Sequence, residues 1–104
     1  MKKEVTSWSK RAVFICTKCS KEIAPSELLN NENVAENFKN YLKAELRTKN
    51  LGKEIRVMTS SCLGTCPKGE QAIAIINSGD NTSQTVIICH PEKDKAEVLD
   101  LISR

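Results

Sequence analysis

A helical repeat of apolar residues separates two short strand-like runs, and this order constrains the fold more than any other feature of the chain. The repeat has an apolar residue at every fourth position: Val34, Phe38, Leu42 and Leu46. Residues 12–15 before it form a continuous apolar run, and residues 54–59 after it alternate. Asn50 and Gly52 supply a stop signal for the helix. The pattern therefore predicts two parallel strands joined by a right-handed helical crossover.

The second half of the chain predicts a hairpin followed by a helix. Residues 71–76 and 85–89 are rich in β-branched residues and flank a turn at residues 77–81. Pro91 is expected to open the last helix, whose buried stripe comprises Val98, Leu99 and Ile102. The predicted fold is a single α/β domain with the order β-α-β-β-β-α. Its mixed four-stranded sheet, with helices packed on it, resembles the thioredoxin-like arrangement.

Length and charge limit the function classes. A chain of 104 residues builds one domain, expected at residues 11–104 after a flexible polar tail at residues 1–10. A dispersed net charge of +3 and few aromatic residues argue against nucleic acid as a partner. The apolar runs are too short to span a membrane, so we expect a cytoplasmic protein. In a reducing compartment the five cysteines are better explained as metal ligands or redox thiols than as a disulfide framework.

Four of the cysteines form two close pairs. Cys16 and Cys19 follow the first predicted strand, whereas Cys62 and Cys66 follow the second. Parallel strands that are neighbours end at the same edge of a sheet, so we expect the two pairs to be close in space. Four converging thiolates can hold a [2Fe–2S] cluster or a tetrahedral zinc ion, or can form a pair of disulfides. Gly64 is expected to shape the second loop so that its sulfurs converge.

The surroundings of these pairs are basic. Lys18, Lys21 and Lys68 are expected to give the site a positive rim. Such a rim suits a redox partner protein with an acidic docking surface.

The segment from Ser61 to Gly69, which contains Cys62-Leu63-Gly64-Thr65-Cys66, carries a more specific likeness. Together with the strand ending at Cys16 and the central helix, it resembles the thioredoxin-like [2Fe–2S] ferredoxin family over roughly residues 11 to 103. The resemblance implies a one-electron carrier rather than an enzyme. It implies that Cys16 and Cys19 bind one iron of the cluster and that Cys62 and Cys66 bind the other. Relatives of this type pair, so a homodimer is among the oligomeric states left open.

Several alternatives remain open at the level of sequence. Cys89 ends the hairpin and is expected to be a small buried residue, but it is also the alternative to Cys19 as the fourth ligand. A thiol–disulfide oxidoreductase that uses Cys16 and Cys19 is the second functional hypothesis. A zinc-binding module and a relative without any cofactor are the third and fourth. His90 is expected to be a surface or capping residue rather than a ligand.

One basic row lies away from the cysteines. It comprises Lys39, Lys43 and Arg47. We expect a solvated helix face there, with a docking patch as the alternative.

Overall fold

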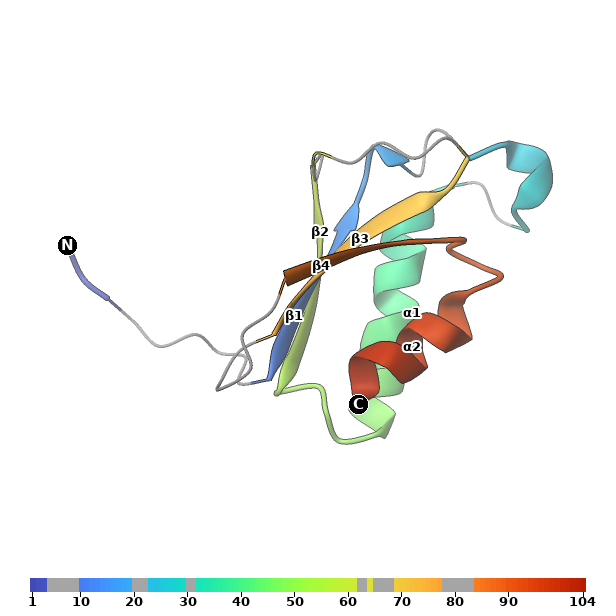
Figure 1. Cartoon of the computed structure of the whole chain (residues 1–104). Coiled ribbons are helices and arrows are strands. Elements are labelled where there is room, and N and C mark those ends of the chain that lie inside the picture. The colour runs from blue at the N-terminus through green and yellow to red at the C-terminus, as the bar shows by residue number, and fades with distance from the viewer. Residues whose placement is uncertain (4–9, 20–22, 30–31, 62–63, 65–68, 78–83) are drawn as a thin grey trace.

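The computed structural model describes residues 1–3, 10–19, 23–29, 32–61, 64, 69–77 and 84–104. Its strands are β1 (Arg11–Cys16), β2 (Ile55–Ser60), β3 (Gln71–Asn77) and β4 (Gln84–Cys89). Its helices are the short 3-10 helix η2 (Pro25–Glu27), α1 (Val34–Thr48) and α2 (Lys95–Ser103). Figure 1 shows these elements along the chain. The predicted order β-α-β-β-β-α is confirmed.

The sheet is mixed and has the strand order β2-β1-β3-β4. β1 pairs in parallel with β2, with Val13 opposite Val57, and antiparallel with β3, with Val13 opposite Ile75. β3 and β4 form the antiparallel pair of the predicted hairpin. Because α1 connects the two parallel strands, the first half of the chain is the predicted crossover unit. The fold is α/β and thioredoxin-like in its arrangement.

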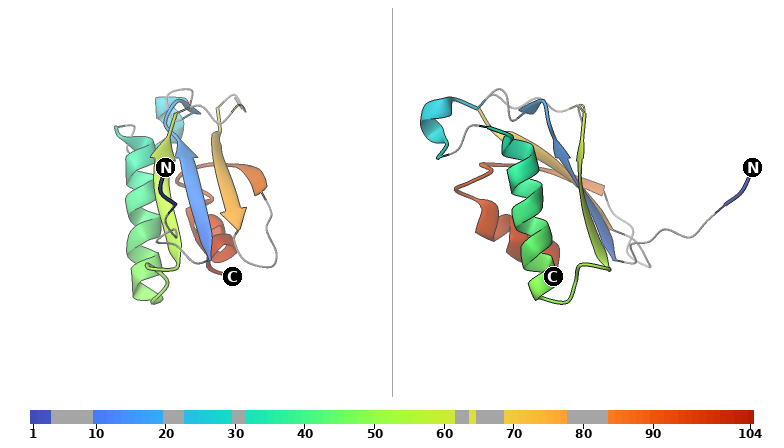
Figure 2. Two further views of the ribbon diagram at one scale, coloured as in Figure 1. Left: turned by 90° about the vertical axis from the view of Figure 1, so that its left-hand side faces the viewer. Right: turned by 180° about the vertical axis from the view of Figure 1, so that it is seen from behind.

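Both long helices pack on the same face of the sheet, as Figures 1 and 2 show. The main core joins residues of α1, α2 and alternate positions of the strands. Its fully or almost fully buried members include Val13, Ile15, Phe38, Leu42, Leu46, Ile73, Val98 and Ile102. The predicted apolar stripes of both helices are therefore confirmed. Neither of these described helices is long and apolar enough to cross a membrane.

The opposite face of the sheet has no helix on it among the described elements. Side chains alternate between the faces of a strand, so Phe14 points away from the face that carries its neighbours Val13 and Ile15. Phe14 is half-buried, and Val86 and Ile88 of β4 are 43% and 41% exposed. A continuous apolar run such as residues 12–15 is typical of a strand buried on both faces. On this face Ala12 and Cys16 are completely buried, but Phe14 between them is only half-buried.

The C-terminal end of α1 forms the expected stop. Asn50 adopts a left-handed conformation with φ of 61°. The Asn50 N–H donates to the Arg47 carbonyl at 3.1 Å, and the Leu51 N–H donates to the Leu46 carbonyl at 2.8 Å. These two bonds are those of a Schellman motif. Leu51 then packs against the core, which directs the chain back toward β2.

The start of the last helix differs from the prediction. α2 begins at Lys95 rather than at Pro91, and residues 91–94 form turns. The Nδ1 atom of His90 accepts hydrogen bonds from the N–H groups of Glu92 and Lys93 at 3.1 and 3.0 Å. The His90 N–H in turn donates to Asp94 Oδ2 at 2.7 Å. These bonds satisfy the backbone in a turn, so the helix starts later. His90 caps this turn rather than α2, whose N-cap is Asp94, and it is buried rather than at the surface.

Candidate functional site

The structure brings Cys16 and Cys19 together at the carboxyl end of β1. Cys16 is 0% exposed and Cys19 is 4% exposed. With Ala72 of β3 they form a small cluster that is separate from the main core. By the alternation of side chains along β1, Cys16 faces away from the helices. The first predicted pair is thus a compact, buried pair of sulfurs on the face of the sheet opposite α1 and α2.

Two hydrogen-bonded contacts hold the strand end that carries Cys16. Cys16 lies opposite Ser60 in the parallel pair β1–β2. The Ser60 carbonyl accepts hydrogen bonds from the Thr17 N–H at 2.8 Å and from Thr17 Oγ1 at 3.0 Å. These bonds continue the β1–β2 pairing past the last residue of β1. The segment that leads to the second cysteine pair therefore starts directly beside the first pair.

Gln71 is a site residue that the cysteine spacing did not predict. Its side chain is completely buried, and Nε2 donates to the carbonyl of Cys16 at 2.8 Å and to that of Ala72 at 2.9 Å. It therefore joins β3 to the end of β1 at the cysteine pair. The available signal was a polar residue in register with the core positions Ile73 and Ile75. Only the fold shows which carbonyl it contacts.

The second cysteine pair lies outside the described residues, as do two members of the predicted basic rim. These residues are Cys62, Cys66, Lys21 and Lys68. Lys18, the third member of the rim, is exposed next to Cys19. Gly64 is described and has a φ of +85°, a conformation that favours glycine. This backbone conformation supports the predicted role of Gly64 in shaping the loop.

Replacing Gly64 with alanine is expected to destabilise the protein by about 1–2 kcal/mol, because a side chain in the left-handed region carries a steric penalty. Nothing lies within 4 Å of an added Cβ, so the penalty comes from the backbone and not from a clash. Gly52→Ala is the matched control, since its Cβ would meet Arg47 Cα at an ordinary 3.6 Å and its φ is not in the left-handed region. Thermal unfolding of both variants checks this, and equal melting temperatures would contradict it.

Cys89 is not brought to the Cys16–Cys19 pair. It is 4% exposed and belongs to the main core on the helix side of the sheet, whereas Cys16 faces the other side. Burial raises the pKa of the Cys89 thiol to about 12, and the carboxylates of Asp94 and Glu70 add to the shift. The group therefore keeps its proton at neutral pH. Its geometry agrees with the small buried residue that the sequence predicted.

His90 is buried beside Cys89, at 9% exposure. Its Nδ1 atom accepts hydrogen bonds in the turn before α2, and its Nε2 atom is buried and has no hydrogen-bond partner among the residues that the structure describes. Within the described ranges, no group of three or more His, Cys, Asp or Glu side chains is placed so that it could hold a metal ion.

Comparison with known proteins finds no relative of this chain. No protein-family model matches the chain, and no curated protein and no solved structure matches it. The fold and the cysteine geometry therefore carry the functional argument.

Proposed function

We propose that this protein transfers single electrons through a [2Fe–2S] cluster held by Cys16, Cys19, Cys62 and Cys66. The observation that carries the proposal is the buried Cys16–Cys19 pair beside Ser60, the last residue of β2. Cys62 follows Ser60 by two residues, and two residues of chain span at most about 7 Å. Covalent geometry thus keeps the start of the second pair within reach of the first.

The residues of the chain fit such a group in kind as well as in number. Cysteine thiolates are the ligands of [2Fe–2S] clusters, and two pairs supply two sulfurs for each iron. When bound, the cluster supplies a site that accepts and releases one electron. Gln71 holds the Cys16 carbonyl, and the β1–β2 pairing holds the strand ends. A pre-formed backbone frame of this kind limits how far the cysteine ligands would move when the cluster gains or loses an electron. Exposed Lys18 is suited to an acidic redox partner.

The thiol–disulfide oxidoreductase remains the second candidate, and one observation counts against it. An attacking cysteine in such an enzyme has to be a thiolate that its substrate can reach. Cys16 and Cys19 are 0% and 4% exposed. Burial of both sulfurs favours a ligand role over nucleophilic attack on a protein disulfide.

Anaerobic purification tests the proposal directly. We expect a red-brown protein with iron and acid-labile sulfide in equal amounts and a reversible one-electron reduction. Colourless protein with stoichiometric zinc after cluster reconstitution would assign the thiols to a zinc site. Colourless, metal-free protein that reduces disulfides would favour the oxidoreductase. A colourless protein with neither property would point to a relative without any cofactor.

Two alanine variants decide the fourth ligand. Cys19 and Cys89 are equally buried, at 4% exposure each, but lie on opposite faces of the sheet. We expect Cys19→Ala to lose the cluster, measured as iron per folded chain, and Cys89→Ala to keep it. The reverse pattern would transfer the ligand role to Cys89. Because both changes remove a buried thiol, each variant controls for the packing effect of the other.

A further inference from the structure

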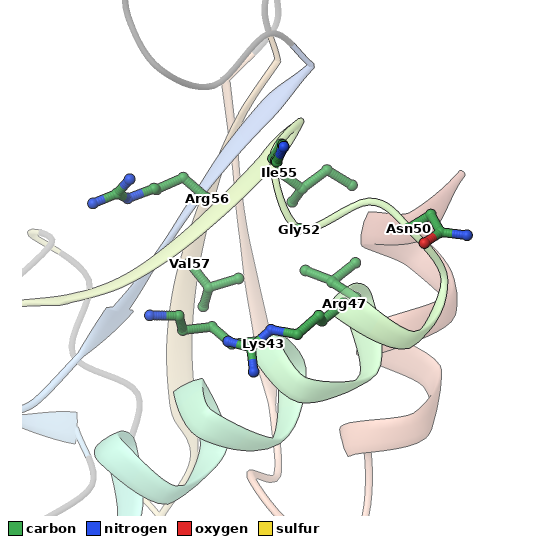
Figure 3. A pocket seen from close by; sticks show the side chains of 9 residues that line it. Lys43, Arg47, Asn50, Gly52, Ile55, Arg56 and Val57 are labelled. Atoms are coloured by element: carbon green, nitrogen blue, oxygen red, sulfur yellow. The ribbon is translucent and has the colours of Figure 1, made fainter.

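A basic cavity lies between α1 and β2, away from the cysteines. Its volume is about 680 Å³. Its floor consists of the buried side chains of Leu46, Ile55 and Val57. Four cationic residues line it, Lys43, Arg47, Lys53 and Arg56. The Arg56 side chain points away from α1 (Figure 3), because it alternates with Ile55 and Val57 along β2. Figure 3 shows the side chains of Lys43 and Arg47 reaching from α1 toward β2, with Val57 above them. We call this cavity the α1–β2 groove.

The charge of the groove is of one sign. Its four cationic residues are exposed, and no acidic side chain is among the described residues that line it. Lys39, one turn before Lys43, pairs with Glu36, but no ion pair between described residues engages Lys43, Arg47 or Lys53. Like charges gathered over an apolar floor raise the local positive potential. The groove is therefore suited to a ligand that carries several negative charges along its length.

The groove also follows an outer edge of the sheet. Among the described strands β2 is the outermost, with β1 on its inner side. The Glu54 carbonyl accepts a hydrogen bond from the Arg11 N–H, and the Ser60 carbonyl accepts one from the Thr17 N–H. The backbone N–H and C=O groups of the even-numbered residues of β2 therefore point toward β1. The alternation of a parallel ladder then directs the backbone N–H and C=O groups of Val57 and Thr59 to the outer side. Such an edge can pair with a further strand.

We propose that the α1–β2 groove binds an extended acidic segment of a partner protein, which adds as a strand to the outer edge of β2. An added strand would lie beside the exposed side of α1, where its acidic side chains meet Lys43 and Arg47. Its backbone would pair with Val57 and Thr59. Cations spread over two elements, together with a strand edge, match an extended chain better than a single compact anion.

The lining of this groove begins at the end of β2 that is far from the proposed electron-transfer site. Ile55 lies opposite Arg11, at the start of β1, whereas Cys16 lies at the end of that strand, opposite Ser60. Five residues of strand correspond to about 16 Å. A segment paired as far as Thr59 would reach the residue next to Ser60, but none of its contacts involves a cysteine. The inference holds for the protein with or without a cluster.

A fluorescein-labelled octapeptide of alternating glutamate and valine serves as the test ligand, with fluorescence anisotropy as the readout. We expect binding at low salt that weakens steeply between about 20 and 200 mM NaCl, where screening becomes strong. In the double variant Lys43→Gln/Arg47→Gln the affinity should fall about tenfold, since two exposed ion pairs are lost. The control Lys3→Gln/Lys93→Gln removes the same charge from exposed positions outside the groove and should stay within about twofold of the unchanged protein.

Amide hydrogen exchange reports on strand addition itself. With saturating peptide we expect slower exchange at the amides of Val57 and Thr59. An equally charged peptide with proline at the central valines should not bind, because proline removes the backbone donors. Equal binding of the proline peptide, or complete competition by tripolyphosphate without any change at these two amides, would overturn strand addition. The chain could instead self-associate in a salt-sensitive way that Lys43→Gln/Arg47→Gln abolishes. That result would assign the groove to a second copy of this chain and would overturn the proposal of a different partner protein.

Discussion

Replacing Gln71 with glutamate is expected to destabilise the protein by about 3–5 kcal/mol at pH 7, the cost of a buried charge without a partner. The Gln71 amide is 0% exposed and donates to two carbonyl oxygens, those of Cys16 and Ala72. A carboxylate in its place would present negative charge to both oxygens instead of donors. Urea unfolding followed by circular dichroism measures the loss.

The size of the effect should depend on pH. Burial would raise the pKa of the new carboxyl in the folded state above its unfolded value of about 4.3. A group with a raised folded pKa costs least below its unfolded pKa, and the cost grows as the pH rises through the folded pKa. The difference in the free energy of unfolding between Gln71→Glu and the unchanged protein should therefore become smaller as the pH falls from 7 toward about 4.5.

Gln71→Leu is the matched control for the charge. This variant removes the Nε2 donor of the hydrogen bond to the Cys16 carbonyl, which should lower the free energy of unfolding by about 1–3 kcal/mol. This loss should not change between pH 5 and 7, because leucine does not titrate. If Gln71→Glu and Gln71→Leu were equally stable at pH 7, the buried charge would not be the reason for the loss in Gln71→Glu.

Raising the pH above 9 is expected to destabilise the protein through Cys89. Burial, with help from Asp94 and Glu70, raises the pKa of this thiol from 9.0 to about 12. Between these values the unfolded chain loses the thiol proton while the folded protein keeps it. The unfolded state then binds fewer protons, so the free energy of unfolding falls by about 1.4 kcal/mol per pH unit. Below pH 9 this contribution is constant.

The comparison with Cys89→Ala isolates the thiol from every other group that titrates in alkali. The difference in unfolding free energy between the unchanged protein and this variant should be flat from pH 7 to about 8.5 and should shrink above that. Urea unfolding in the presence of a reductant, at half-unit steps up to pH 10.5, measures it. A difference that stays constant across this range would mean that Cys89 is accessible to solvent in the folded protein.

Much of the fold was predictable because it depends on local pattern. The apolar repeat of α1 and its end near Asn50 follow from helical spacing and from the backbone freedom of asparagine. The start of α2 was not predictable in the same way. Pro91 suits the first turn of a helix, but His90 and Asp94 form side-chain bonds that hold a turn until Lys95. Contacts of this kind compete with the helix and leave no periodic signal.

The candidate site was also predictable only in part. The two cysteine pairs and the strands that precede them are visible as sequence spacing. Which of Cys19 and Cys89 accompanies Cys16 is not, because each follows or ends a strand and each is a small buried residue. The face that a strand residue occupies depends on its register with the neighbouring strands. Register places Cys89 on the helix side and Cys16 on the opposite side.

The order of the elements, the parallel crossover and the two cysteine pairs follow from the sequence alone, because apolar periodicity and chain direction are local properties. The packing of the folded chain adds that both long helices cover one face, that Gln71 contacts the Cys16 carbonyl and that Cys89 lies apart from Cys16 and Cys19. It also placed the cations of α1 beside the outer edge of β2. These features join residues far apart in the chain, and only the packing of the sheet against its helices brings them together.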